Sequence, residues 1–423
     1  MSTRTGQNEQ SVMQTYPEKT WKLWEIAILC VVMPGMVLTL FYVFTKLRFF
    51  FGVDYRMFHI WQAGWMKTGV FYPEDTVFFN FPLTVAAFGP YGFLPVDMAV
   101  KLKFIQTAAL SVYAMHLLMK IRPGLTKQAN SALFAMVIIG ATFFLTQLFY
   151  LNIYVEVTVC LMASLYHDEK GNDRLSAFFL CLAVIFKVFL FPMLLAPLLV
   201  RRYRLFGWHL GFMAFFVVLS LALFGPGTHV DMLTAMSETY SKMRLHGITY
   251  PFVSDGFAGW QDVFNKLMVL GLIGRDIIMP LTLTLAGLYG CLFLYTCFLI
   301  YGLAGSGLNN RVIYANVFAS LLILSLGFNF RFDHGTLFLC AVPFFADPHM
   351  RNRGLMVASL TVLTLSRLFF VEILKAVGLV AASKAFAAVF YVLSFQFIGI
   401  NLLVFLVVQH WIVREREEGQ HGI

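Results

Sequence analysis

Apolar runs about as long as a membrane-spanning helix recur along the whole chain. Crossing the hydrocarbon core of a bilayer takes about 20 predominantly apolar residues. Apolar runs, most of them near or above this length, lie at about 24–50, 103–119, 131–149, 152–167, 175–200, 207–225, 277–303, 312–328, 335–346, 355–378 and 385–411. Charged residues make up only 13% of the chain, against about 25% in a typical soluble domain. The sequence therefore predicts an all-α, polytopic integral membrane helical bundle.

One of these runs, at 175–200, contains an interruption. Lys187 lies inside it, and Pro192 and Pro197 follow. A lysine in the middle of a bilayer is expensive, so such residues are rare and usually functional. We expect either two short helices that meet at the membrane face or one broken helix.

The net charge of +9 is explained by where the basic residues fall. Lysine and arginine gather in short loops at 120–127, 167–174, 201–204 and 349–353, which the positive-inside rule places in the cytosol. Tails 1–23 and 412–423 fall on the same side, and counting run 175–200 as two passes gives about twelve spans. No long basic stripe occurs, so we expect no nucleic-acid partner.

This topology leaves a single transmembrane domain, 24–411, with outer loops at 51–103, 226–275 and 329–334. The first loop includes an apolar stretch, 82–95, that is short and punctuated by Gly89, Pro90 and Gly92. We expect helices there that lie in the interface or dip into the membrane. If this stretch crossed the bilayer, the sidedness of the preceding segment would reverse relative to the later loops.

The sequence indicates neither a metal site nor a cofactor site. All six cysteines lie within apolar runs, where thiols usually behave as small hydrophobic groups, and none has zinc-ligand spacing. The first outer loop has no Asp-x-Asp motif, and no Walker loop, dinucleotide fingerprint or Ser-His-Asp arrangement occurs. We therefore expect no disulfide framework, no metal and no cofactor, although Glu74-Asp75 in the first outer loop leaves a metal site as an alternative.

A short acidic and aromatic segment, residues 51–56, follows the first apolar run directly. Asp54 and Arg56 lie in it, with Arg48 just before. Further polar residues at the outer ends of later runs include Lys187 and His334. A carboxylate with several cations at one face suggests a base that faces a bound anion, such as a lipid phosphate.

The order of motifs resembles glycosyltransferase family eighty-seven, bacterial membrane enzymes of the GT-C superfamily. The resemblance covers roughly residues 50–205. Its motifs are Asp54-Tyr55, Gly69-Val70-Phe71-Tyr72-Pro73, Phe79-Asn80-Phe81-Pro82, Gly89-Pro90-Tyr91-Gly92-Phe93-Leu94-Pro95, Gln147-Leu148-Phe149-Tyr150-Leu151-Asn152, and Lys187 with Phe191-Pro192 and Arg201-Arg202-Tyr203-Arg204. Thr146 stands where the family commonly has glycine, and Phe81 where a Tyr-Pro pair often begins.

The resemblance implies that a sugar passes from a polyprenyl-phosphate carrier to a lipid or glycan acceptor. The sugar would be mannose or arabinofuranose, and the reaction would take place at the outer face of the bacterial inner membrane. Asp54 would be the general base of an inverting reaction, since an attacking hydroxyl must lose its proton. Cationic groups would hold the departing phosphate: Lys187, Arg331, His334 and Arg56. The residues expected to bind substrate are Tyr55, Tyr72, Asn80, Gln147, Asn152 and Trp260.

Each residue also has a simpler interpretation. Asp54 would be a solvated residue at a helix end, Lys187 would extend to the lipid headgroups, and His334 would end a span. Gln147 and Asn152 would bond neighbouring helices to each other. At the level of the whole protein, a transporter or lipid-linked-sugar flippase is the main alternative, although the chain lacks the internal repeat of many transporters. A polysaccharide polymerase or ligase with a diphosphate-linked donor is the second.

Overall fold

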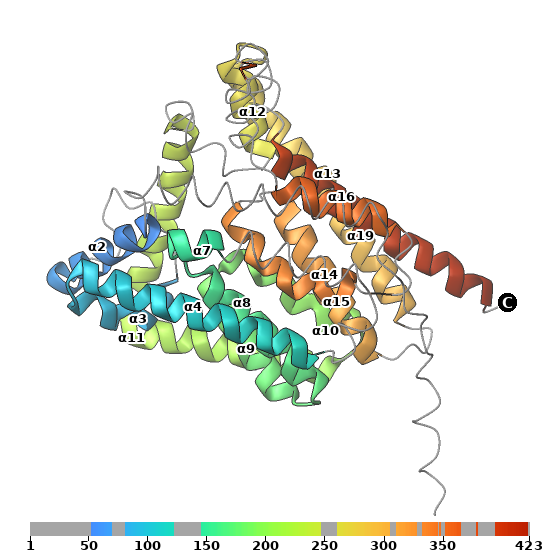
Figure 1. Cartoon of the computed structure of the whole chain (residues 1–423), viewed down its shortest axis with the longest axis horizontal. Helices are drawn as coiled ribbons and strands as arrows, with labels where there is room; N and C mark the ends of the chain where they lie inside the picture. The colour runs from blue at the N-terminus through green and yellow to red at the C-terminus, as the bar shows by residue number, and fades with distance from the viewer. Residues whose placement is uncertain are drawn as a thin grey trace, which may run out of the picture.

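The structure is a computed structural model, and it describes residues 52–69, 81–121, 145–246, 260–304, 310–327, 332–345, 347, 352–364, 378–379 and 394–421. Every regular element in these residues is helical (Figure 1). In chain order they are α2 (Val53–Thr68), α3 (Pro82–Ala87), η2 (Gly89–Phe93), α4 (Val96–Ile121), α7 (Leu145–Tyr150), α8 (Tyr154–Glu169), α9 (Asp173–Phe186), η4 (Val188–Leu195), α10 (Ala196–Leu199), α11 (Tyr203–His246), α12 (Trp260–Val269), α13 (Arg275–Leu303), α14 (Asn310–Gly327), η6 (Phe332–Ala341), α15 (Val342–Phe345), α16 (Arg353–Thr364) and α19 (Phe395–His421).

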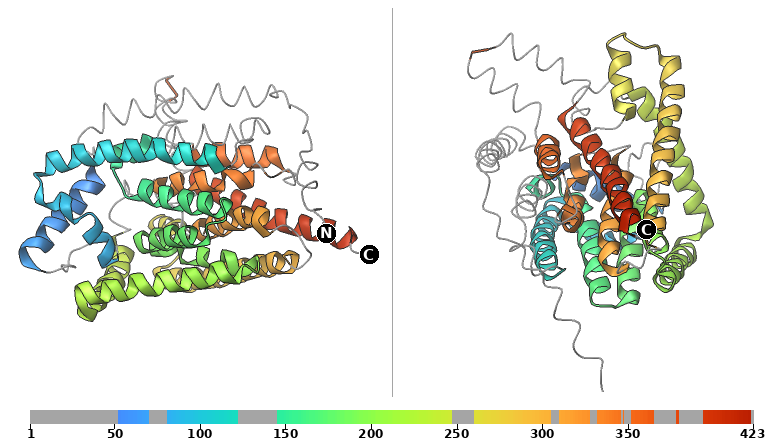
Figure 2. Two further views of the ribbon diagram at one scale, coloured as in Figure 1. Left: turned by 90° about the horizontal axis from the view of Figure 1, so that it is seen from below. Right: turned by 90° about the vertical axis from the view of Figure 1, so that its right-hand side faces the viewer.

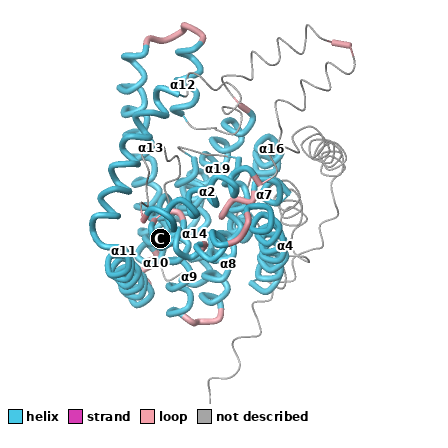
Figure 3. Tube along the Cα trace, turned by 90° about the vertical axis from the view of Figure 1, so that its left-hand side faces the viewer, coloured by secondary structure: helices cyan, strands magenta, loops and turns pink. Residues whose placement is uncertain are grey.

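The long helices form two packed groups. In the first, α8 packs against α4 and α9, and α9 packs against α11, so that α4 and α11 flank the α8–α9 pair (Figure 3). In the second, α19 packs against α13, α14 and α16. The helix α14 also contacts η4, η6 and α10, and it therefore joins the two groups. Many helix axes run roughly along the long axis of the molecule (Figure 2).

Two apolar clusters fill the interior. The larger is built around α8, α9 and α14, with side chains such as Leu161, Leu180 and Phe318 fully buried. The smaller cluster lies around α2 and includes Tyr55 and Phe58. Phe81 and Phe186 pack against both clusters. The α2 end of the molecule is thereby connected to the main core.

Four of the described helices are long and apolar enough to cross a membrane: Val96–Ile121, Tyr203–Thr234, Asp276–Leu303 and Phe395–Glu417. In the most apolar 18-residue stretch of Asp276–Leu303, 0% of the residues are buried. In the corresponding stretch of Phe395–Glu417, 56% of the residues are buried. A helix that exposes so many apolar side chains needs an apolar surrounding. The composition of these helices agrees with the membrane class that the sequence predicts.

The interruption expected at Lys187 is present. Helix α9 ends at Phe186, and Lys187 has an extended backbone with φ −144° and ψ 96°. The tighter helix η4 follows with Pro192 inside it, and α10 then begins with Pro197 in its first turn. The lysine thus stands between two helical pieces of one apolar run.

The stretch 82–95 contains two helices that are each too short to cross a bilayer. Phe81 precedes α3, which has six residues and begins with Pro82. Pro90 lies in the first turn of η2, which has five residues. The hydroxyl of Thr84 donates a hydrogen bond to the Ile185 carbonyl oxygen at 2.9 Å, so α3 is fixed to the end of α9 just before Lys187.

A kink divides α11 near the predicted end of the apolar run at 225. Gly225 has φ 74° and ψ 163°, a conformation open almost only to glycine, and Pro226 follows without an N–H to donate. His229 spans the kink: its Nδ1 bonds the Gly225 carbonyl oxygen at 2.8 Å, and its Nε2 bonds the Ser220 hydroxyl at 2.9 Å. Helix therefore continues into the segment 226–275, up to His246.

Candidate functional site

The start of α2 is packed against two other elements of the predicted outer face. Gly52, with φ 65°, leads into the helix, and a Cβ on it would meet Leu151 and Val100 side-chain carbons at 3.2 Å. Only glycine offers both this conformation and this space. Asp54 lies in the first turn of α2, and its side chain is outside those that the structure describes.

Helix α7 and the loop that follows it carry two predicted substrate-binding residues, Gln147 and Asn152. Gln147 is fully buried, and its backbone carbonyl oxygen accepts a hydrogen bond from the backbone N–H of Leu151, with 2.7 Å between nitrogen and oxygen. The side-chain oxygen of Asn152 accepts one from Ile153 N at 2.7 Å. Leu151 itself has φ 58°, in the left-handed region that non-glycine residues rarely adopt. Strain of this kind gathers at binding and catalytic sites.

Two predicted phosphate-binding residues meet on the ring of Tyr154, the first residue of α8. The Nζ of Lys187 lies 4.7 Å from the centre of this ring. His334, from η6, bonds the Tyr154 hydroxyl through Nε2 at 2.9 Å, and its ring lies 4.9 Å from the rings of both Tyr154 and Phe189. We call these four residues the Tyr154 cluster.

The Tyr154 cluster is well placed for an anion. The first N–H groups of an α-helix have no intrahelical partner and carry the positive end of the helix dipole. Tyr154 opens α8 after Ile153, which makes no side-chain cap. Lys187 and His334 themselves gather on the side chain of Tyr154, and an ammonium group and an imidazole ring are both able to bind a phosphate.

A buried ion pair that the sequence analysis missed lies beside this cluster. Lys103 of α4 is 0% exposed, and its Nζ is paired with Oε1 of Glu156 on α8. The same Nζ lies 4.8 Å from the centre of the Phe88 ring and 6.0 Å from that of Tyr55. We call these four residues the Lys103 cluster. Both charged residues stand near the outer ends of predicted spans, and the rule that intramembrane charges are paired was the signal available in the sequence.

Aromatic rings connect the two clusters. Phe88 of the Lys103 cluster packs on Phe186 with ring centres 6.0 Å apart, and Phe186 directly precedes Lys187. On α8, Tyr154 and Glu156 are two positions apart, so their side chains leave the helix in different directions. The contact between Phe88 and Phe186 therefore links the buried ion pair to the end of α9, where Lys187 follows.

Tyr55, predicted to bind substrate, is 2% exposed. Its ring packs edge-on against Tyr91, with ring centres 6.0 Å apart. Burial, with smaller contributions from Tyr91 and Glu156, raises the pKa of Tyr55 well above its ordinary value. The hydroxyl of Tyr55 thus keeps its proton, and it can both donate and accept a hydrogen bond.

Arg56, predicted to bind the donor phosphate, pairs with Asp97. Its Nη2 lies 3.0 Å from Oδ1 of Asp97, and the two side chains are 39% and 74% exposed. Exposed ion pairs of this kind contribute little stability. In this structure Arg56 therefore lies at the protein surface, where the first turn of α2 meets the first turn of α4.

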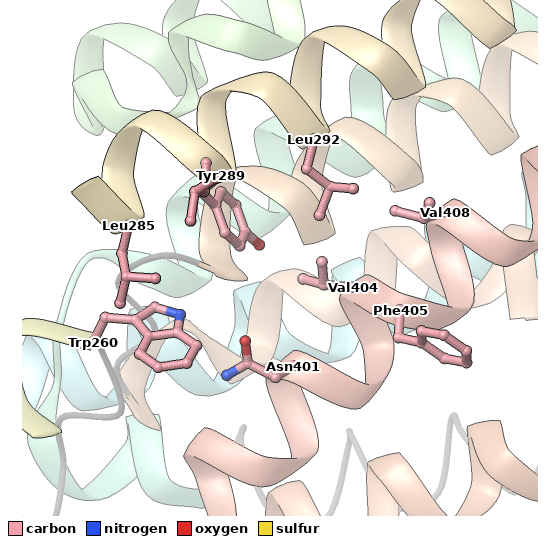
Figure 4. Close-up of a pocket in the computed structure, with 9 residues that line it drawn as sticks. Trp260, Leu285, Tyr289, Leu292, Asn401, Val404, Phe405 and Val408 are labelled. Atoms are coloured by element: carbon pink, nitrogen blue, oxygen red, sulfur yellow. The ribbon is translucent and has the colours of Figure 1, made fainter. Parts of the chain in front are cut away.

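Trp260, also predicted to bind substrate, is the first residue of α12 and belongs to neither the Tyr154 cluster nor the Lys103 cluster. Its ring packs edge-on against Phe397, with ring centres 4.8 Å apart. It lines one end of an apolar groove of about 310 Å³ between α13 and α19 (Figure 4). Around this groove the side chains of Tyr289, Asn401 and Val404 point inward.

Three other predicted site residues, Arg331, Tyr72 and Asn80, lie outside the described residues. Within the described ranges, no group of three or more histidine, cysteine or acidic side chains is arranged to hold a metal ion. The described cysteines are free thiols: Cys160, Cys181, Cys291, Cys297 and Cys340.

No protein-family model matches this chain, and no curated protein and no solved structure matches it significantly.

Proposed function

We propose that this protein is a membrane glycosyltransferase that moves a mannose- or arabinofuranose-like sugar from a polyprenyl-phosphate donor to a lipid or glycan acceptor. The proposal includes a GT-C-like bundle of about twelve spans in the bacterial inner membrane, with the site at the outer face. The observation that carries it is the meeting of Lys187 and His334 on Tyr154 at the start of α8.

The chemistry assigns a role to each group. As the anomeric carbon is attacked, the bond to the polyprenyl phosphate breaks and negative charge grows on that phosphate. The ammonium group of Lys187, the ring of His334 and the N–H groups of α8 stabilise this charge in a site that is poor in water. Arg331 and Arg56 are the further cations that we assign to the donor.

Asp54 is the general base in this proposal. It takes the proton of the acceptor hydroxyl while the new glycosidic bond forms, which inverts the configuration at the anomeric carbon. Its position in the first turn of α2 supports this role, because Gly52 at the start of that helix packs against Leu151. Leu151 lies between Gln147 of α7 and Asn152 of the following loop. Gln147, Asn152, Tyr72 and Asn80 would then bind the sugar or the acceptor.

The test uses purified protein with radiolabelled mannosyl- and arabinosyl-phosphoryl polyprenols and extracted bacterial lipids. We expect the wild type to release or transfer sugar and Asp54→Asn to lose this activity while still binding donor. The matched control is Asp231→Asn, which removes an exposed carboxylate on α11 and should behave as wild type. Near-normal turnover by Asp54→Asn would disprove its role as base. Intact donor in every sample would favour a transporter or flippase.

A further inference from the structure

We propose that Glu156 and Tyr55 form a binding subsite for the hydroxyl groups of a sugar, held in place by Lys103. The choice of a sugar as ligand rests on the function proposed above. To Tyr55, which the sequence motifs already indicate, the subsite adds Glu156 and Lys103, which they do not.

The subsite is built from three elements that pack together. Tyr55 comes from α2, Lys103 from α4 and Glu156 from α8, and α4 contacts both of the other helices. Lys103 pairs with one carboxylate oxygen of Glu156, Oε1. The cation is also covered by the ring of Phe88. The position of the Glu156 carboxylate is thus fixed by its partner.

Three buried polar atoms on these helices have unused hydrogen-bonding capacity. Among the described residues, none forms a hydrogen bond with Oε2 of Glu156, the hydroxyl of Tyr55 or the hydroxyl of Thr107, although all three atoms are buried. Thr107 lies one turn after Lys103 on α4. Leaving a buried polar atom unsatisfied destabilises a protein by about 1–3 kcal/mol, and such atoms call for an explanation.

The chemistry of these atoms fits neutral hydroxyl groups. An ionised carboxylate oxygen only accepts hydrogen bonds, whereas a tyrosine or threonine hydroxyl can also donate. Because Lys103 already balances the charge of Glu156, the pair does not call for a further ion. A sugar supplies several hydroxyl groups that both donate and accept, and the rings of Tyr55 and Phe88 provide an apolar side.

The location fits a sugar that is attached to a phosphate. Phe88, which covers the Lys103 ammonium group, contacts Phe186, the residue before Lys187. This aromatic contact joins the hydroxyl-binding groups to the end of α9, where the anion-binding Lys187 follows. The region reaches the surface through Tyr91, which is partly exposed and donates a hydrogen bond to Oε1 of Gln106 at 2.8 Å.

Tyr55→Phe is the sharpest variant, because it removes only a hydroxyl that has no hydrogen-bond partner among the described residues. The probes are radiolabelled octyl α-mannoside and octyl arabinofuranoside, with protein in phospholipid nanodiscs and with empty discs as background. We expect Tyr55→Phe to weaken binding of the preferred glycoside about tenfold, with an unchanged or higher Tm. Tyr113→Phe, an exposed tyrosine on α4, is the matched control and should bind as wild type.

A second variant separates binding from folding. Glu156→Gln alone leaves Lys103 buried without its partner charge, so we combine it with Lys103→Met, which keeps the volume and removes the charge. We expect the folded double variant to lose glycoside binding. If it binds as tightly as wild type, the pair is only structural and the proposal is overturned.

The outcomes also separate this proposal from the proposed function. Wild-type affinity in Tyr55→Phe, or no glycoside binding by the wild type, overturns the subsite whether or not donor is cleaved. Loss of glycoside binding in Tyr55→Phe supports the subsite even if the wild type leaves every polyprenyl-phosphate sugar intact. In that case the transferase proposal fails, and the subsite belongs to a protein that binds sugar without cleaving its donor.

Discussion

The hydroxyl of Tyr154 bonds Nε2 of His334 at 2.9 Å, although 180 residues separate the two in the chain. The bond fixes the histidine ring on the first residue of α8, beside Lys187. If His334 holds a phosphate, its orientation is part of the binding site, because a preorganised group loses less free energy when it binds.

The first prediction concerns that orientation. Tyr154→Phe keeps the ring that Lys187 contacts and removes the hydrogen bond to His334, so we expect donor affinity to fall about threefold to tenfold. Donor binding measured with radiolabelled polyprenyl-phosphate sugar checks this. Tyr166→Phe, on the same helix and only partly buried, serves as control. Unchanged affinity in Tyr154→Phe would remove the case for His334 as a positioned phosphate ligand.

The second prediction concerns the stability of the Lys103 cluster. Removing one charge of a buried pair typically destabilises a protein by about 3–5 kcal/mol, whereas replacing both partners by uncharged groups is often close to neutral. Lys103→Met should therefore lower the Tm strongly, and adding Glu156→Gln should restore most of the loss. Thermal unfolding of the purified variants measures both effects. A single variant as stable as wild type would contradict the buried pairing.

The third prediction concerns the contact between α16 and α19. A Cβ on Gly399 would lie 2.7 Å from the backbone nitrogen of Leu363, so the two helices approach each other where glycine leaves room. Gly399→Ala should destabilise the protein by about 1–3 kcal/mol, as overpacking does. Gly354→Ala, on α16 with nothing within 4 Å, is the control and should be neutral or slightly stabilising. Equal Tm values for the two variants would rule out the close approach.

The fourth prediction concerns the kink in α11. Gly225→Ala places a side chain on a backbone with φ 74° and ψ 163°, which destabilises by about 1–3 kcal/mol. The ring of His229, which bonds the Gly225 carbonyl oxygen, packs against Phe81 just before α3, so the variant should also reduce sugar release. Gly211→Ala, earlier in α11 and in open space, should be stable and active. If Gly225→Ala releases sugar as the wild type does and is equally stable, neither stability nor activity depends on the kink.

The all-helical fold class and the local interruptions of its helices could be predicted from the order of the amino acids. Long apolar runs require helices in a membrane because backbone groups find no water there. The break at Lys187 and the short helices at 82–95 follow from prolines, glycines and a charge that act on their immediate neighbours. Such local effects can be predicted from the sequence without knowing what the segment packs against.

Which distant side chains meet could not be predicted, because such contacts depend on how the helices pack. Lys103 and Glu156 are 53 residues apart in the chain. In the sequence, each is simply a charged residue near the end of an apolar run. Their pairing depends on how α4 packs against α8, as the contact of Lys187 and His334 with Tyr154 depends on how η4 and η6 pack against the start of α8. Hydropathy specifies that a helix is buried in apolar surroundings but not which neighbour it faces. The geometry of the candidate site therefore came from packing, because packing alone brings segments distant in sequence into contact.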